Sequence, residues 1–191
     1  MPIRGRTPQR PEAPHGRSAV KRALLDAGRQ LFAVRGPNSV SVRELAAVAG
    51  VNHGLVHRYF GSKDGLLGAV LDDLAHQIAD TVTSELQPID LDDSTVDAYW
   101  RVLARAILDG RDPATLQSDF PTVRALVAKG RADGHSPSAS RERAAHVLAL
   151  ELGWRMFKPF LAAATGLRLD DPGVARRSLN RAVGRLLHPA H

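Results

Sequence analysis

Apolar residues recur at helical spacing along most of this chain, and no stretch alternates in the way a strand would. In the first such segment Val20, Leu24, Ala27, Leu31 and Val34 fall at i, i+4, i+7, i+11 and i+14, on one helix face. The pattern predicts an all-α fold of about nine helices, at residues 18–35, 42–49, 53–60, 62–86, 95–110, 113–118, 121–129, 141–165 and 171–187.

Breaks between these helices are predicted where Pro, Gly and small polar residues gather. Residues 88–94 read as a short acidic linker, and residues 130–140, GRADGHSPSAS, as a flexible loop. Pro159 lies inside the predicted helix 141–165 and should kink it. The helix at 62–86 is long enough to leave the N-terminal part and act as a stiff connector, which makes it the expected lever between the two parts of the chain.

Residues 41–63, SVRELAAVAGVNHGLVHRYFGSK, predict two short helices joined by a tight turn. Ser41 and Glu44 have the spacing of a capping box at the first helix. Gly50 can end that helix, and Asn52 is a suitable cap for the next one. A capped helix, a glycine-containing turn and a polar-faced second helix predict a helix-turn-helix that places its second helix in the DNA major groove.

The second of these helices buries Leu55 and Val56 and turns polar residues outward. The side chains predicted to bind DNA are Ser41, Arg43, Asn52, His53, Gly54, His57, Arg58, Tyr59 and Lys63. Arg58 suits either a bidentate contact to guanine or a phosphate contact, and Gly54 either allows a close approach to DNA or is simply a small residue. His53 and His57 have metal-ligand spacing, but the Glu of H-E-x-x-H is missing and no third ligand follows, so no metal site is predicted.

Charge is concentrated in the same part of the chain. Residues 1–65 hold 11 Lys or Arg against 4 Asp or Glu, whereas the remainder holds 15 against 16. This asymmetry indicates a polyanionic partner, although a basic tail that only aids solubility would give the same counts. Arg4, Arg6, Arg10 and Arg17 make residues 1–17 either a disordered basic arm along DNA or a leader without a role.

Several classes of function are excluded by what the sequence lacks. The 191 residues include no cysteine, so disulfides, cysteine nucleophiles and thiolate metal sites are ruled out. No apolar run approaches 18 residues, and the basic N-terminus lacks the apolar core of a secretory signal. There is no nucleophile elbow, dinucleotide fingerprint or phosphate loop. We therefore expect a cytoplasmic protein that is not an enzyme and carries no cofactor.

The motifs of residues 30–67 resemble the DNA-binding signature of the tetracycline-repressor (TetR) family of bacterial regulators. The resemblance rests on QLFAVRG at 30–36, SVRELA at 41–46, AGVN at 49–52, RYF at 58–60 and GSKDGLL at 61–67. It implies a homodimeric, ligand-responsive repressor on a palindromic operator, with Arg43 reaching DNA and Lys63 contacting phosphate. His57 stands where the family usually has Tyr, and Leu55 where a small hydroxyl residue is common, so the resemblance does not extend to base preference or to one phosphate contact.

The resemblance divides the chain into residues 1–17 as the arm, 18–63 as the DNA-binding domain, and 64–191 as a domain for ligand binding and dimerisation. It also implies an unknown small-molecule effector and a dimer formed through the last two helices, whose apolar faces would otherwise close the core of the monomer. Aromatic and apolar side chains of this part line the expected pocket or form plain core: Trp100, Leu103, Phe120, Trp154 and Phe157. The rival interpretation is a helical small-molecule-binding or scaffold protein with a basic solubilising N-terminus.

Overall fold

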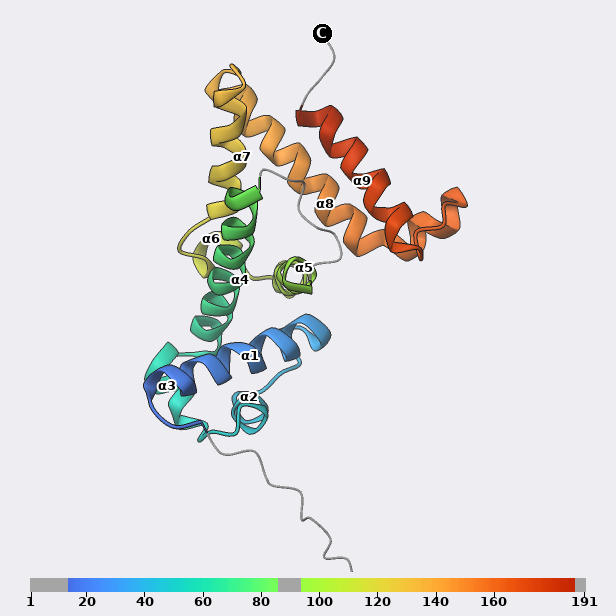
Figure 1. Ribbon diagram of the computed structural model, residues 1–191. Coiled ribbons are helices and arrows are strands. Elements are labelled where there is room, and N and C mark those ends of the chain that lie inside the picture. The colour runs from blue at the N-terminus through green and yellow to red at the C-terminus, as the bar shows by residue number, and fades with distance from the viewer. Residues whose placement is uncertain (1–13, 86–93, 188–191) are drawn as a thin grey trace, which may run out of the picture.

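The computed structural model describes residues 14–85 and 94–187, and these residues form nine helices and no strand (Figure 1). The helices are α1 (Arg17–Arg35), α2 (Val42–Val48), α3 (Gly54–Phe60), α4 (Lys63–Glu85), α5 (Ser94–Leu108), α6 (Pro113–Leu116), α7 (Pro121–Ala132), α8 (Pro137–Thr165) and α9 (Pro172–Leu187). The all-α prediction is confirmed. Within the described residues, no helix has the length and apolar character that crossing a membrane requires.

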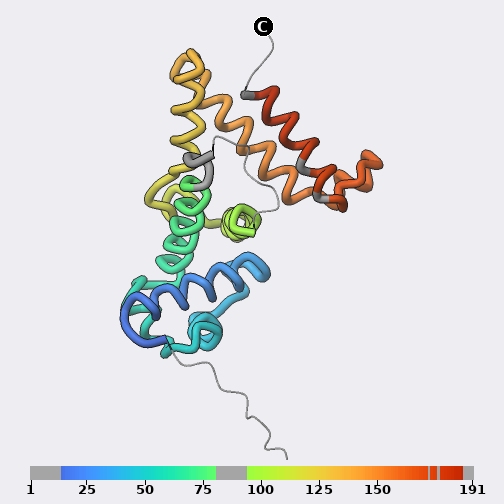
Figure 2. Tube along the Cα trace, viewed as in Figure 1, coloured from blue at the N-terminus to red at the C-terminus, as the bar shows by residue number. Residues whose placement is uncertain are grey.

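Helix α4 is the central helix, and α1, α3, α5, α6 and α7 all pack against it. Figures 1 and 2 show α1, α2 and α3 gathered at its first half, α7 beside its second half, and α9 alongside α8. Helix α6 lies against the first half of α4, near Gly68, and α8 packs against α7 as well as α9. Helix α5 packs against α1, α4 and α8, so it connects the N-terminal helices with the C-terminal ones. At Gly68 the backbones of α4 and α6 come so close that a Cβ would lie 2.2 Å from the carbonyl oxygen of Leu116.

The main hydrophobic core runs without a break from α1 through α5. Its largest fully buried side chains include Phe32, Leu24, Leu45, Val56, Leu66, Leu67, Leu71 and Leu74. A smaller cluster of Val147, Leu179 and Val183 lies between α8 and α9. Since the first cluster joins residues on both sides of residue 63, the predicted domain boundary there stays a prediction. Val34, predicted for the inner face of α1, is 67% exposed at the end of that helix.

The predicted loop at residues 130–140 is wrong. Helix α7 continues to Ala132 and α8 begins at Pro137, so only four residues connect them. Gly130 and Ser140 are buried where the helices touch, and a Cβ on Gly130 would meet the Ser140 Oγ at 3.0 Å. The small residues that suggested a loop instead allow two helices to pack closely.

The structure describes only some of the segments where the sequence predicts an arm, a linker or the end of a helix. Residues 1–13 of the predicted arm, most of the acidic linker and the end of the fourth helix at residue 86 lie outside the described residues. Arg17, assigned to the arm, is the first residue of α1. Helix α8 continues past Pro159 to Thr165 and ends at Gly166 in the left-handed conformation.

Candidate nucleic-acid interface

Helix α2 is fixed at its start by the predicted capping box, which is confirmed. The Glu44 N–H donates to Ser41 Oγ at 3.2 Å, and the Ser41 N–H and hydroxyl both donate to Glu44 Oε2 at 2.8 Å. Arg35, at the end of α1, adds a 2.7 Å ion pair to the same carboxylate. The backbone and hydroxyl hydrogen bonds from Ser41, followed by the Arg35 bond, lower the pKa of Glu44 from 4.5 to about 2. These contacts occupy the Ser41 hydroxyl in the protein without DNA.

Helix α3 presents one side to the core and the other to solvent. Val56 is fully buried, and Leu55 packs against the core at the edge. His53, the residue directly before α3, makes no side-chain capping bond, but the Asn52 side chain one position earlier accepts a 2.8 Å hydrogen bond from the Gly54 N–H and so supplies the capping contact. The helix ends at Gly61, whose φ of 74° suits glycine.

The exposed face of α3 carries His53, Gly54, His57 and Arg58. The His57 Nδ1 lies 3.1 Å from the Gly61 carbonyl oxygen. A carbonyl oxygen only accepts, so Nδ1 carries the hydrogen, and in the neutral ring Nε2 is left as an acceptor. This contact aims one defined polar atom of His57 away from the backbone.

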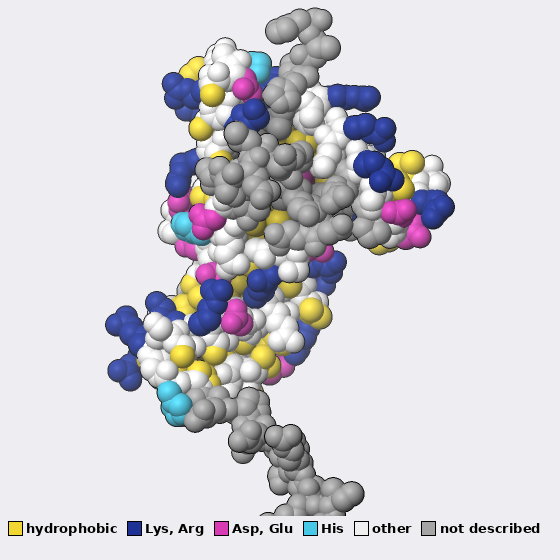
Figure 3. Space-filling model, in the orientation of Figure 1, with side chains coloured by type: hydrophobic (Ala, Val, Ile, Leu, Met, Phe, Trp, Pro, Cys, Tyr) yellow, Lys and Arg dark blue, Asp and Glu magenta, His cyan; other side chains and the backbone are white. Residues whose placement is uncertain are grey.

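Tyr59 is half-buried, unlike the exposed residues of α3 predicted to contact DNA. Its ring packs against the core, and the guanidinium carbons of Arg17 and Arg58 lie 6.0 and 5.9 Å from its centroid. These are cation–π distances, so the aromatic ring positions two arginines at the surface. Figure 3 shows Lys and Arg side chains standing out at the edge of the molecule where α1 and α3 lie.

Arg43 and Lys63 are the two predicted phosphate contacts outside α3. Arg43 lies on α2 and is exposed to solvent. Lys63 is half-buried, and its Nζ donates to the carbonyl oxygens of Pro37 at 2.7 Å and Val40 at 3.0 Å. Since an ammonium group has three donors, one remains for a phosphate, and the predicted role of Lys63 stays a prediction.

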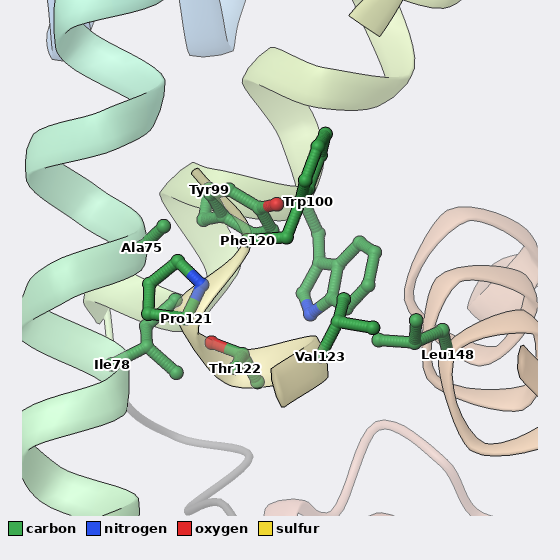
Figure 4. Close-up of a pocket in the computed structure, with 9 residues that line it drawn as sticks. All are labelled: Ala75, Ile78, Tyr99, Trp100, Phe120, Pro121, Thr122, Val123 and Leu148. Carbon is green, nitrogen blue, oxygen red and sulfur yellow. The ribbon is translucent and has the colours of Figure 1, made fainter. Parts of the chain in front are cut away.

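The predicted ligand pocket is only partly assembled. Trp100 and Phe120 line a cavity with Ala75, Ile78, Tyr99, Pro121, Thr122, Val123 and Leu148 (Figure 4), but its volume is about 20 Å³, room for roughly one water molecule. Leu103 is buried in the core and does not line this cavity. Phe157 is 57% exposed and lines neither this cavity nor the hollow described next.

Trp154 lines a larger hollow of about 340 Å³ between α5, α8 and α9. Its other lining residues are Ser94, Asp97, Arg101, Arg155, Lys158 and Ala175. The Trp154 Nε1 is buried and has no hydrogen-bond acceptor among the described residues. The hollow is therefore richer in donors and positive charge than the aromatic pocket expected from the sequence.

Sequence reasoning missed the side chains that join distant parts of this region. Arg35 reaches Glu44 and the Ser39 carbonyl oxygen, and Arg111 reaches Asn38 and Asp64. The partners of Arg111 lie 73 and 47 positions away in the chain, so no local pattern could have identified them.

The chain matches the family model described as bacterial regulatory proteins, tetR family, over residues 24–70. It is 45% identical to the HTH-type transcriptional repressor Rv3405c of Mycobacterium tuberculosis over 180 residues, which cover 94% of this chain and 95% of that protein. It is similar in fold to a putative TetR-family regulator from Rhodococcus sp., with a TM-score of 0.62 and 23% identity over 90% of this chain and 100% of that one. It also resembles a TetR variant from Acinetobacter baumannii AYE in complex with minocycline, with a TM-score of 0.50 and 17% identity over 91% and 94% of the two chains.

Proposed function

Because this chain belongs to the TetR family of bacterial regulatory proteins, we propose that it represses transcription by binding a specific DNA operator through the exposed face of α3. The observation that carries the proposal is the division of α3 into a buried side, held by Val56 and the cap at Asn52, and an exposed side of polar residues. A short helix held on one side and open on the other is what major-groove docking requires. Since the proposed target is chromosomal DNA, we place the protein in the bacterial cytoplasm.

Base reading is assigned to His57 and Arg58. With Nδ1 donating to Gly61, the neutral His57 ring offers Nε2 as an acceptor, which suits the amino group of cytosine or adenine. Arg58 offers two parallel donors, which match the O6 and N7 atoms of guanine. His53 and Gly54, at the start of α3, lie where the recognition helix comes nearest to base edges. Arg43 and Lys63 would contact phosphates on either side, and the Ser41 hydroxyl would join them by exchanging its hydrogen bond to Glu44 Oε2 for one to a phosphate.

The test is operator binding by Arg58→Ala, with Arg101→Ala as the matched control. Arg101 is an exposed arginine on α5, outside the proposed interface. If Arg58 reads guanine, its loss should weaken operator binding by about 1–3 kcal/mol and relax base preference at one position in a selection assay. Weaker binding with unchanged preference would assign Arg58 to the backbone. Wild-type protein that binds no fragment of its own genome at low salt would favour the rival scaffold interpretation.

We infer that the protein acts as a homodimer through α8 and α9. The second half of α8 and the residues after it expose large apolar side chains that the described part of the subunit leaves open to solvent: Met156, Phe157, Phe160 and Leu167. Exposed apolar area of this kind marks an interface more often than bare surface. A two-fold dimer would present two copies of α3 to successive major grooves, so the operator should be palindromic with half-sites about 34–36 Å apart.

Regulators of this family bind small-molecule ligands, and we infer that the effector of this one is a small anion bound in the hollow between α5, α8 and α9. The hollow falls in the size range of ligand pockets, roughly 300–1,000 Å³, whereas the aromatic cavity does not. Arg101 is ion-paired with Asp97, and Arg155 with Asp97 and Glu151, so Lys158 supplies the positive charge in excess. The buried Trp154 Nε1 needs an acceptor. A planar carboxylate would supply both the charge and the acceptor.

A thermal-shift comparison of aromatic carboxylates with their matching amides tests this assignment. We expect naphthoate to raise the melting temperature, naphthamide to leave it unchanged, and Lys158→Ala to abolish the shift. Equal shifts by acid and amide, or a shift that Lys158→Ala retains, would contradict an anionic ligand in this hollow.

A further inference from the structure

The end of α5 contacts three segments that flank the helix-turn-helix. Arg105 Nε donates to the Ala33 carbonyl oxygen at 3.1 Å, in the last turn of α1. The Asp109 carboxylate accepts from the Asn38 N–H at 2.8 Å, in the turn between α1 and α2. We call Arg105, Asp109 and Arg111 the α5 clasp.

Arg111 is the member of the clasp that links two segments at once. Its Nε donates to Asp64 Oδ1 at 3.0 Å, in the first turn of α4, and its Nη1 donates to Asn38 Oδ1 at 2.6 Å. Only 18% of the Arg111 side chain is exposed, whereas 54% of Asp64 is, so solvent screens the pair from the Asp64 side while the guanidinium itself is held in place. One guanidinium therefore holds the turn before α2 and the start of α4 together.

The contacts of Arg105 and Asp109 have a clear physical basis. The last carbonyl groups of α1 lack partners within the helix, and a cation at that end also interacts favourably with the helix dipole. Arg105 supplies both the donor and the charge. Asp109 in turn satisfies a backbone N–H of the α1–α2 turn, so the end of α5 acts as an external cap for α1.

The two segments held by the clasp are also joined to each other. Lys63, the first residue of α4, donates to the carbonyl oxygens of Pro37 and Val40 in the α1–α2 turn. Residues 41–61, which contain α2 and α3, thus begin and end at points fixed by the same cluster of hydrogen bonds. A displacement of the end of α5 would move both points.

We propose that Arg105, Asp109 and Arg111 are positioning residues for DNA binding, and that α5 transmits the state of the C-terminal helices to α3. This inference rests on the proposed DNA-binding function. Helix α5 carries Asp97 and Arg101 at its first half, in the wall of the hollow, and the clasp at its end. Its 15 residues span about 22 Å as one rigid element. Helix α5 therefore connects the C-terminal helices with the helix-turn-helix by a second route. The first route is α4, which is expected from the sequence to link the two parts of the chain.

The experiment compares Arg111→Ala with Arg124→Ala in full-length protein. Both remove an arginine, but Arg124 is an exposed residue of α7 whose ion pair is with Asp119, outside the clasp and outside the hollow. Without the clasp, α3 adopts its binding orientation for a smaller fraction of the time, and the apparent operator Kd rises in inverse proportion to that fraction. We expect about tenfold weaker operator binding for Arg111→Ala, unchanged binding to non-specific DNA, and wild-type behaviour for Arg124→Ala.

Two further readouts separate positioning from simple loss of stability. Asn38→Ala combined with Arg111→Ala should weaken operator binding no more than Arg111→Ala alone, because both changes break the same link. The chain has no cysteine, so a single nitroxide at Ala47→Cys on α2 reports its distance to the same label in the partner subunit. In the Arg111→Ala background this distance distribution should broaden.

The outcomes are decisive in each case. If wild-type protein binds its operator and Arg111→Ala binds equally well, or if Arg111→Ala weakens operator and non-specific DNA by the same factor, the positioning role is wrong. If Arg111→Ala does not fold, Asp109→Asn provides the test with an expected two- to fivefold loss, and no loss would overturn the proposal. Wild-type protein that binds no operator at all would instead contradict the proposed function.

Discussion

Replacing Phe160 with serine should separate the proposed dimer into subunits. The ring is 67% exposed in the single chain, and fully burying a phenylalanine contributes about 1.5–3 kcal/mol. Covering the exposed part therefore stabilises by about 1–2 kcal/mol, and a two-fold interface contains the ring twice. Phe160→Ser should weaken the dimer by about 2–4 kcal/mol, or roughly 30- to 1,000-fold in Kd. Phe157→Ser, at 57% exposure, should act similarly.

Sedimentation equilibrium over a range of protein concentrations measures this change, with circular dichroism as the check on folding. Leu108→Ser is the matched control, because Leu108 is 75% exposed at the end of α5, away from α8 and α9. A monomeric Phe160→Ser should also lose most operator affinity, although no DNA-facing side chain has changed. A dimer Kd within threefold of wild type, or equal weakening by Leu108→Ser, would refute the assignment of this face.

Three further predictions concern stability. Ser41→Ala removes the hydroxyl that caps α2 and should cost about 1 kcal/mol in urea unfolding, while Glu44→Gln, which keeps the capping geometry, should cost less. Gly68→Ala should destabilise by about 1–3 kcal/mol despite the better helix propensity of alanine, since its Cβ would lie 2.2 Å from the Leu116 carbonyl oxygen; a gain in stability would contradict this close approach. Burial raises the pKa of Glu151 above 4.5, so the folded state binds the proton more tightly, and stability should fall as pH rises from 4.5 through the folded pKa. The melting temperature of Glu151→Gln relative to wild type should therefore increase over that window, and a pH-independent difference would show that the carboxylate does not titrate this way.

The helix-turn-helix was predictable because its signals are local. The capping box at Ser41 and Glu44, the glycine at position 50 and the cap at Asn52 each act within four residues, and the structure contains both caps. The side of α3 that faces solvent followed from Val56, the apolar residue that the helix must bury. Which of the exposed side chains contact DNA stays a prediction.

The parts that sequence reasoning missed depend on contacts between distant segments. Gly130 and Ser140 have the composition of a loop, but their small size allows α7 and α8 to touch, and only the tertiary packing reveals this. Similarly, the aromatic residues expected to line one pocket lie at two separate places in the folded subunit. Trp100 and Phe120 border a cavity of about 20 Å³, while Trp154 lines the hollow beyond α5.

The separation of the two sides of α3 has an evolutionary consequence. Its attachment to the subunit depends on Val56 and on hydrogen bonds at its ends, whereas His53, His57 and Arg58 contribute little to the core. Substitutions at these three positions can alter the preferred base sequence while the scaffold keeps its stability. After a gene duplication, a daughter protein could thus acquire new target promoters through a handful of codon changes between His53 and Arg58.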